Sequence, residues 1–448
     1  MSGKPTETPT REVCAEERLI ELLRILLSPH PSEAVNDEAD APSASGESPL
    51  SVTAAEAERS DAPRETRERP ASVTAAEAGR FDVTKTPSLP ALSEGEEGRL
   101  YRLSKDQDLA HLILPAAERA GLELPSPYAE KYQKRMFLAL YRDERMTAAL
   151  RRVGEALSDA KIVHLPLKGA IMRTLYPESW QRTSCDMDIL VHEEQLDDAV
   201  RALEAIGYRN EGREFHDVSM TSEDGLLLEL HFNIEENIPT LDRVLDRVWE
   251  YALPSEEDPF LYRMHPSFFL FHLLAHMSYH FTSGGCGVRP FMDVFLYRRS
   301  TAYDEAELSA LLSDASLIKF AAGVFRLCDA WFAGAEADEL CRGMEIFLLH
   351  GGVYGTMEQR TQLQYMKKKG RLGFILYRLF PPMRILSGHF PVLQKHPWLA
   401  PVFYVRRMIR FLFRKDVRDR ASRSLQMTGA MNEETVDRTK HLIEQLGL

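Results

Sequence analysis

The sequence predicts an α+β protein with a small mixed sheet inside a mainly helical chain. Strand-like runs and short helical segments alternate between residues 161 and 238. Helical periodicity precedes them over residues 98–160 and follows them from Pro239 to the C-terminus. The stretch at residues 29–95 has few large apolar side chains with which to form a core. We therefore expect an α+β core between helical segments, preceded by a disordered tether.

The same patterns divide the chain into five segments. They are a short N-terminal helix at 1–28, a disordered low-complexity linker at 29–95, a helical domain at 98–160, the α+β core at 161–238 and a helical C-terminal domain with a basic region at 239–448. Within the linker, Ser51–Ala57 recurs as Ser72–Ala78, and two copies are too few for a repeat fold. We attribute the repeat to duplication within the linker. The leading helix is expected to dock on the body or on a partner.

The first strand-like run of the core carries two acids ahead of its apolar residues: Asp186-Met187-Asp188-Ile189-Leu190-Val191. Because side chains alternate across a strand, Asp186 and Asp188 point to the same face, about 7 Å apart. Two carboxylates on one rigid strand repel each other unless a cation lies between them. Mg²⁺ suits this arrangement, since it binds one or two carboxylates together with substrate phosphates.

A helix and a hairpin are expected after this strand. Apolar residues in Gln195–Ile206 recur at helical spacing, and Gly207 is a plausible C-cap. Two strand-like runs follow, Phe215–Thr221 and Leu226–Asn233, and the residues between them are Ser222-Glu223-Asp224-Gly225. An Asp-Gly pair between two such runs is a strong hairpin signal.

Glu229 is the candidate for a third acid. It shares one face of its run with Leu227 and His231, while leucines occupy the other face. A carboxylate in a leucine-rich strand is costly to bury unless it is paired or bound to metal. If this strand lies beside Asp188, Glu229 completes a site of three carboxylates.

A glycine turn, Lys168-Gly169-Ala170, precedes these strands, at a place where the backbone would come close to a triphosphate. Each element also has an ordinary alternative. Acid pairs are common on solvated faces, many turns contain Lys-Gly, and Glu229 would also suit an exposed edge. The ordered set of glycine turn, acidic strand, helix, hairpin and acidic strand favours a functional site.

With these elements in place, the chain resembles the nucleotidyltransferase superfamily with a polymerase-beta-like core, and within it the bacterial family of uncharacterised nucleotidyltransferases. The resemblance is carried by Leu167–Ala170, Leu175-Tyr176, Arg182–Val191 and Leu228–His231. Weaker matches bring the covered span to about residues 98–415; they are Tyr101–Lys105, Gly351–Gly355, Phe380–Pro382 and Pro397–Pro401 with Arg406. Two features depart from the superfamily: Ala170 stands where glycine or serine is common, and the spacer to Asp186 is longer.

The resemblance implies transfer of a nucleoside monophosphate from an NTP to an acceptor, with release of pyrophosphate. It implies that Asp186, Asp188 and Glu229 are the catalytic residues and hold Mg²⁺ or Mn²⁺, as two ions about 3.5–4 Å apart. Glu229 would also accept the proton of the acceptor. This chemistry depends on positioning and charge neutralisation more than on covalent catalysis.

The resemblance also implies a donor site formed by Lys168, Gly169, Ala170, Arg182 and His231. Gly169 would allow close approach of the phosphates, and backbone N–H groups of the following helix would bind them. Lys168 and Arg182 would neutralise phosphate charge. The alternatives are a solvated turn lysine at 168 and a structural ion pair between Arg182 and one of the acids.

The acceptor is expected to be a small molecule such as a sugar, an antibiotic-like compound or a peptide product. One alternative is a toxin-type enzyme that modifies tRNA or protein. Another is a non-catalytic scaffold that binds nucleotide, although the presence of all three acids counts against it. No pattern in the sequence identifies the acceptor, because acceptor specificity resides in loops and helices without a recognisable code.

Composition and charge limit the kinds of partner and the cellular compartment that fit this protein. The net charge of −13 over 448 residues argues against a general nucleic-acid coat protein. Five cysteines form no CxxC pattern and leave an odd thiol, which favours a reducing compartment. The N-terminus has no signal-peptide core, and the longest apolar run, around Phe268–Met277, is too short to span a bilayer. We expect a cytoplasmic protein without a transmembrane segment.

Three histidines, His272, His276 and His280, recur at a spacing that places them on one face of a helix. Two of them would bind zinc with Asp293. Alternatively, the histidines would line the active cleft or be structural. Further on, residues 360–420 contain fifteen lysines and arginines against two acids. This basic region would bind an RNA acceptor, contact an anionic membrane, or form a solvated helical face.

Overall fold

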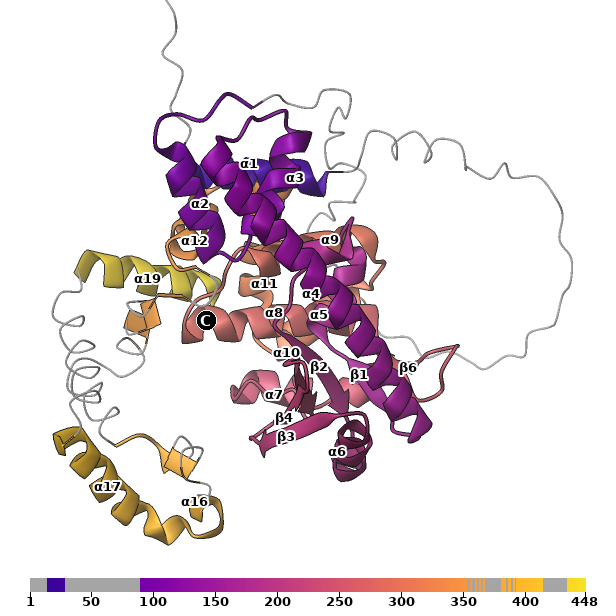
Figure 1. Cartoon of the computed structure of the whole chain (residues 1–448). Helices are drawn as coiled ribbons and strands as arrows, with labels where there is room; N and C mark the ends of the chain where they lie inside the picture. Colours follow the sequence, from indigo (N-terminus) through magenta and orange to yellow (C-terminus); the bar gives the residue numbers. More distant parts are fainter. Residues whose placement is uncertain are drawn as a thin grey trace, which may run out of the picture. The chain divides into compact units, whose positions relative to one another are not determined.

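The computed structural model describes residues 14–28, 89–352, 392–413 and 433–448, together with scattered positions between 355 and 390. A five-stranded mixed sheet lies within a mainly helical protein (Figure 1), which confirms the predicted fold class. The predicted linker at 29–95 falls almost entirely outside the described residues, and the domain boundaries remain a prediction.

The sheet has the strand order β1-β2-β5-β4-β3. Its strands are β1 (His164–Pro166), β2 (Asp186–Val191), β3 (Tyr208–Arg213), β4 (Asp217–Ser222) and β5 (Leu227–His231). Only β2 and β5 pair in parallel; the other neighbours are antiparallel. The connection between the two parallel strands contains α6 (Leu196–Ala205), β3 and β4, since a parallel pair requires a long crossover.

The two faces of the sheet differ in chemistry because side chains alternate along each strand. Met187 and Ile189 of β2, with Leu228 and Leu230 of β5, pack in one hydrophobic cluster with α4 (Ser126–Asp159) and α6. The acids of β2 and β5 therefore point to the opposite face. On that side Leu190 joins the core of the helical body.

The helical body combines segments from both ends of the sequence around one hydrophobic core. Its helices are α1 (Ala15–Leu27), α2 (Glu96–Asp106), α3 (Ala110–Arg119), α8 (Pro266–Ser283), α9 (Arg289–Ser300), α10 (Glu305–Asp314), α11 (Ile318–Phe332), α12 (Glu339–Leu349) and α19 (Glu433–Leu446). Helix α1 contacts α2, α3 and α11, so the leading helix docks on the body. Of the helices that the structure describes, none has both the length and the apolar character to cross a bilayer.

Shorter elements complete the described chain. They are α5 (Lys168–Met172), the 3₁₀ turns at Arg173–Leu175, Ser179–Gln181, Glu193–Gln195, Val248–Tyr251 and Pro397–Leu399, α7 (Pro239–Leu245), the β6–β7 pair (Ala252–Pro254 and Tyr262–Met264), α16 (Val392–Lys395) and α17 (Ala400–Phe413). The β6–β7 pair interrupts the helical segment expected after Pro239. Most of the lysines and arginines of the predicted basic region lie outside the described residues.

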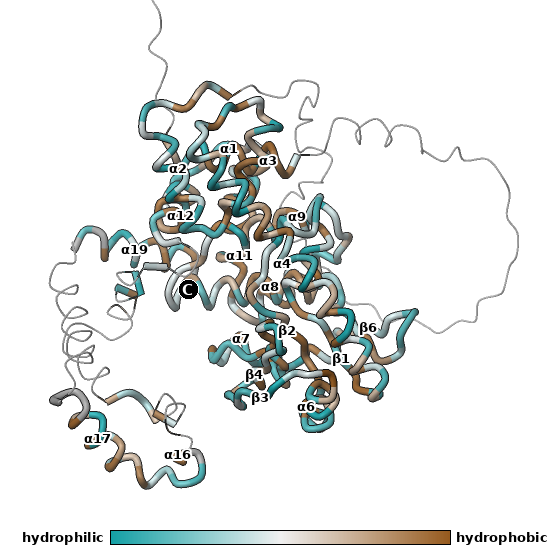
Figure 2. The backbone as a smooth tube through the Cα atoms, viewed as in Figure 1, coloured by the Kyte–Doolittle hydropathy of each residue, from teal (hydrophilic) through white to brown (hydrophobic). Residues whose placement is uncertain are grey.

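Several sequence-based elements are confirmed. The β4–β5 hairpin turns through Ser222–Gly225, with Gly225 at a φ of 83°. The edge strands β1 and β3 were not predicted. The first has three residues, and the second, almost wholly exposed and hydrophilic (Figure 2), lacks the apolar alternation that marks a half-buried strand.

A buried ion pair attaches α1 to α2. Arg18 Nε lies 3.1 Å from Glu96 Oε1, and the two side chains are 1% and 2% exposed. Arg18→Ala leaves Glu96 buried without its cation, and we expect the free energy of unfolding to fall by about 3 kcal/mol. Arg151→Ala removes an exposed pair with Glu155 and should cost less than about 1 kcal/mol. Urea denaturation of both variants tests this, and equal losses would contradict it.

Candidate active site

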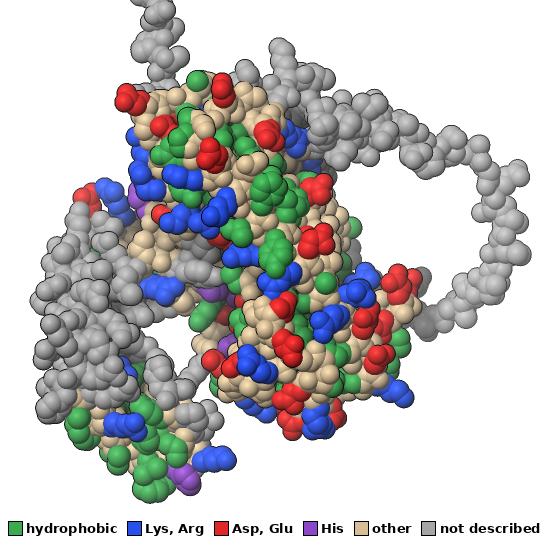
Figure 3. All heavy atoms as spheres, in the orientation of Figure 1, with side chains coloured by type: hydrophobic (Ala, Val, Ile, Leu, Met, Phe, Trp, Pro, Cys, Tyr) green, Lys and Arg blue, Asp and Glu red, His purple; other side chains and the backbone are tan. Residues whose placement is uncertain are grey.

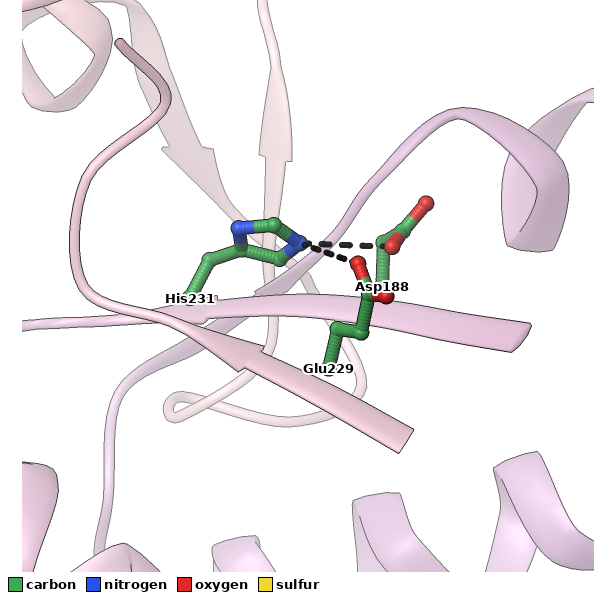
Figure 4. A group of neighbouring side chains, drawn as sticks. All are labelled: Asp188, Glu229 and His231. Carbon is green, nitrogen blue, oxygen red and sulfur yellow. Dashed lines mark hydrogen bonds and ion pairs between the residues drawn. The ribbon is translucent and has the colours of Figure 1, made fainter. Parts of the chain in front are cut away.

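The register of the two parallel strands brings two of the predicted acids together. Asp188 lies directly opposite Glu229 in the pairing of β2 with β5, and neighbours in register share a face of the sheet. His231, two residues along β5, points to the same face. Its Nε2 lies 3.2 Å from Asp188 Oδ1 and 3.6 Å from Glu229 Oε2 (Figure 4). One ligand atom from each residue lies within 4.8 Å of the others, a separation suited to a shared cation.

Asp186 stands at the start of β2, opposite Leu227. Its carboxylate is not a member of the close group of Asp188, Glu229 and His231. Its charge nevertheless interacts with the other two acids. Burial first, and then the negative charges of Asp188 and Glu229, raise the pKa of Asp186 to about 6. This end of the sheet therefore carries negative charge that its own surroundings do not balance.

His231 balances part of that charge. Burial alone would lower the pKa of His231, but hydrogen bonds with Asp188 and Glu229 raise it to about 9. Burial likewise opposes ionisation of Asp188. The hydrogen bond from His231 and the positive charge of Lys168 outweigh it and hold the pKa of Asp188 well below its usual range. The pair is therefore ionised at neutral pH.

The glycine turn is hydrogen-bonded to β2 beside the acids. Leu167 N–H donates to Asp188 C=O at 2.9 Å, and α5 begins at the next residue. A Cβ on Gly169 would lie 2.5 Å from Ser184 Oγ, so any other residue there would displace that side chain. The Ala170 N–H, expected to face a phosphate, donates to Leu167 C=O at 3.1 Å.

Lys168 connects the turn to the histidine helix. Its Nζ lies 3.2 Å from His276 Nδ1, and the same ring nitrogen lies 2.6 Å from Glu236 Oε1. His280 Nε2 is 3.0 Å from His276 Nε2. Burial, and then the charge of Lys168, lower the pKa of His276 well below its usual value, so that ring is neutral. Of the three interpretations, the geometry favours histidines beside the site for His276 and His280.

The third histidine differs from the other two. Both ring nitrogens of His272 are buried without a hydrogen-bond partner among the described residues, and burial lowers its pKa well below the usual value. Asp293 is engaged elsewhere: it accepts from Tyr176 Oη at 2.7 Å and pairs with Arg182 at 2.8 Å. The described residues therefore do not bring Asp293 and the histidines into one metal site.

Arg182 was expected either to contact phosphate or to form a structural ion pair. Its guanidinium is bound to Asp293, while its Nη1 donates to Thr183 C=O at 2.9 Å and to Ser184 Oγ at 3.2 Å. The ion pair does form, but with an acid of α9 outside the three-carboxylate set. Arg182 thereby holds the loop before β2 against α9.

A hollow adjoins Asp186 on the side of α4. It is lined by residues that include Arg142 and Asp143 of α4, Gly169 and Ala170 of α5, and Thr183 and Ser184 of the loop before β2. We call it the Asp186 hollow. Sequence reasoning missed Glu236 and Arg142, because nothing in their local pattern separates them from ordinary surface polar residues. It gave no role to Ser184, although that residue lies in the Arg182–Val191 stretch.

Comparison with known families decides the class of protein. The family model of the uncharacterised nucleotidyltransferases matches residues 93–333, more than half of the chain. The chain belongs to this family. The matched span contains every site residue described above, from Arg142 to Asp293. Membership in the nucleotidyltransferase family makes the chain an enzyme and implies an NTP as donor.

The solution structure of the antibiotic-resistance factor ANT(2'')-Ia is also similar to this member of the uncharacterised nucleotidyltransferase family. Sequence identity is 12% and the TM-score is 0.31; the match covers 40% of this chain and 95% of the other. No curated protein matches the chain as a relative.

The charge on Asp186 yields a stability prediction for this nucleotidyltransferase. Its folded-state pKa of about 6 exceeds the value of about 4 in an unfolded chain. Ionised Asp186 therefore destabilises the metal-free protein as pH rises through that interval. In EDTA, we expect Asp186→Asn to raise the free energy of unfolding at about pH 8 by on the order of 2 kcal/mol, and to leave it unchanged near pH 3.

Urea denaturation at the two pH values measures this difference. Asp197→Asn is the matched control, since it removes the charge of an exposed acid on α6. It should change stability little at either pH. A lower stability of Asp186→Asn at the higher pH in EDTA would refute the electrostatic account of the site.

Proposed function

We propose that this enzyme transfers the nucleoside monophosphate of an NTP to a hydroxyl or similar group on a small molecule and releases pyrophosphate. One observation carries the proposal. Parallel pairing of β2 with β5 sets Asp188 directly beside Glu229, with Asp186 two residues earlier on the same face. Three carboxylates at the end of a rigid sheet supply the oxygen ligands that nucleotidyl transfer requires.

The residues fit Mg²⁺ or Mn²⁺. Hard cations prefer carboxylate oxygens, and the raised pKa of Asp186 reports negative charge that lacks compensation. Asp186, Asp188 and Glu229 would hold the ion. When bound, it would neutralise charge on the phosphates and on the attacking and leaving oxygens.

The chain's own residues perform the remaining tasks. Glu229 accepts the proton of the acceptor hydroxyl. The acceptor oxygen forms a bond to the α-phosphorus while the bond from that phosphorus to the bridging oxygen of pyrophosphate breaks. His231 orients Asp188 through their 3.2 Å contact. Lys168 supplies positive charge to the donor phosphates, while Gly169 and Ala170 leave space beside it. Arg182 positions the loop into β2 through Asp293.

Two observations support a small acceptor. The carboxylates are recessed, with the side chains of Asp188 and Glu229 15% and 30% exposed. The helix α8 approaches the same region through the contact of Lys168 with His276. A recessed site admits a small hydroxyl compound more readily than a folded macromolecule. We therefore place modification of tRNA or protein second.

The test is transfer of label from each α-labelled NTP, with Mg²⁺ or Mn²⁺, to a cell extract separated into RNA, protein and small-molecule fractions. We expect wild type to label the small-molecule fraction. Asp188→Asn should reduce transfer by about a thousandfold or more, because it removes a carboxylate that would hold the ion while preserving side-chain size.

Glu211→Gln provides the matched control, because it neutralises an exposed acid on β3 of the same sheet. Its transfer rate should equal that of wild type. Normal metal-dependent turnover by Asp188→Asn would contradict the assignment of the site. Label found only in RNA or protein would replace the small acceptor with a macromolecular one.

A further inference from the structure

A second hollow adjoins the Asp186 hollow on the surface of α4. Its lining includes Lys105 at the end of α2, Arg135 and Arg142 of α4, and Thr183 of the loop before β2. Ala139, Arg142 and Thr183 line both hollows, so the two lie next to each other along α4. We call the second hollow, defined by Lys105, Arg135, Arg142 and Thr183, the basic groove.

The spacing along α4 explains how the basic groove forms. Arg135, Ala139 and Arg142 are four and three residues apart, which places them on one face of the helix. The small side chain of Ala139 leaves room between the two arginines. Lys105 reaches the same hollow from α2, so cations from two helices surround it.

Charge in the walls of the two hollows is unbalanced. Three acids line the two hollows: Asp108 is paired with Arg289, Asp143 with Arg173 and Ser179, and Asp186 belongs to the carboxylate group of the active site. Within the described part of the chain, Lys105, Arg135 and Arg142 have no carboxylate partner. Clusters of unpaired cations in a hollow attract anions and hold them through charge-assisted hydrogen bonds.

A buried hydroxyl in the groove also lacks a partner. Thr183 Oγ1 is inaccessible to solvent and makes no hydrogen bond with any described residue. A buried hydroxyl left unpaired costs free energy. Because this oxygen has no accessible surface, it would donate a hydrogen bond to an anion in the groove only after the Thr183 side chain rotates.

One apolar side chain also lines the groove. Leu138 of α4 is 41% exposed. In Figure 3, basic side chains lie beside exposed hydrophobic ones on this face of the molecule. A ligand with an anionic group and an apolar portion would match both features.

We propose that the basic groove binds the anionic group of the acceptor, a phosphate, sulfate or carboxylate, so that the acceptor is a small acidic molecule. This inference rests on the proposed nucleotidyl transfer. Lys168 lines neither hollow and contacts α8 instead, so a separate cation is available to the donor phosphates. Three unpaired cations suit one or two anionic groups, whereas RNA binding typically uses about six to ten phosphate contacts.

The test compares the double variant Arg135→Glu/Arg142→Glu with Lys134→Glu. Lys134 is the matched control, because it is an exposed neighbour on α4 that lines neither hollow. Acceptors are taken from the small-molecule extract after separation on an anion exchanger. We expect label in the retained compounds. The double variant should lose about 10- to 100-fold in kcat/KM for the acceptor, with an unchanged Kd for a non-hydrolysable NTP.

A second measurement tests anion binding in the basic groove independently of nucleotidyl transfer. Inorganic phosphate should raise the melting temperature of wild type and Lys134→Glu but not of Arg135→Gln/Arg142→Gln, which keeps uncharged side chains of similar reach. Equal stabilisation of all three would overturn the proposal, as would acceptors that pass through the exchanger unbound. If Arg135→Glu/Arg142→Glu loses as much affinity for the NTP as it loses in kcat/KM for the acceptor, the groove would be reassigned to the donor. Label in RNA would reject a small acceptor.

If wild type labels no fraction, the proposed function fails, and the comparison of phosphate binding still decides whether the groove is an anion site.

Discussion

Electrostatic repulsion among carboxylates at one end of the sheet is the constraint on which the rest of this structure depends. Asp186, Asp188 and Glu229 share a face of β2 and β5, and burial strengthens their mutual repulsion. His231 offsets part of it through hydrogen bonds to Asp188 and Glu229. Lys168, the first residue of α5, adds positive charge. The remaining imbalance is what a divalent cation and the phosphates of an NTP would resolve.

The apolar face of the sheet keeps these acids in place. A slip of one residue between β2 and β5 would turn the acids toward α4 and α6 and expose leucines on the other side. The cluster formed by Met187, Ile189, Leu228 and Leu230 against those helices opposes such a slip. On the acidic side, the ion pair of Arg182 with Asp293 ties the loop before β2 to α9. The packing of the apolar face and the ion pair of Arg182 thus both favour the observed pairing of β2 with β5.

The contribution of sequence patterns can be judged residue by residue. Alternation along β2 predicted that Asp186 and Asp188 share a face, and the Asp-Gly pair predicted the β4–β5 hairpin, because both rules are local. The pairing of β5 with β2, which makes Asp188 and Glu229 neighbours, was only a condition of the predicted site, because it joins strands distant in the sequence. The contact of Lys168 with His276 and the pairing of Arg182 with Asp293 join residues more than a hundred positions apart. They depend on how helices pack, which no periodicity encodes. The basic groove was missed for the same reason, since α2 and α4 contribute to it separately.

Binding of Mn²⁺ in the presence of a non-hydrolysable NTP tests the central claim most directly. Wild type should bind Mn²⁺ in competition with Mg²⁺, and Glu229→Gln should weaken that binding by about tenfold or more, since it removes a carboxylate at the centre of the group. Glu236→Gln, which alters a nearby acid outside that group, should bind as wild type does. Equal Mn²⁺ affinity in wild type and Glu229→Gln would contradict the assignment of this cluster as the metal site.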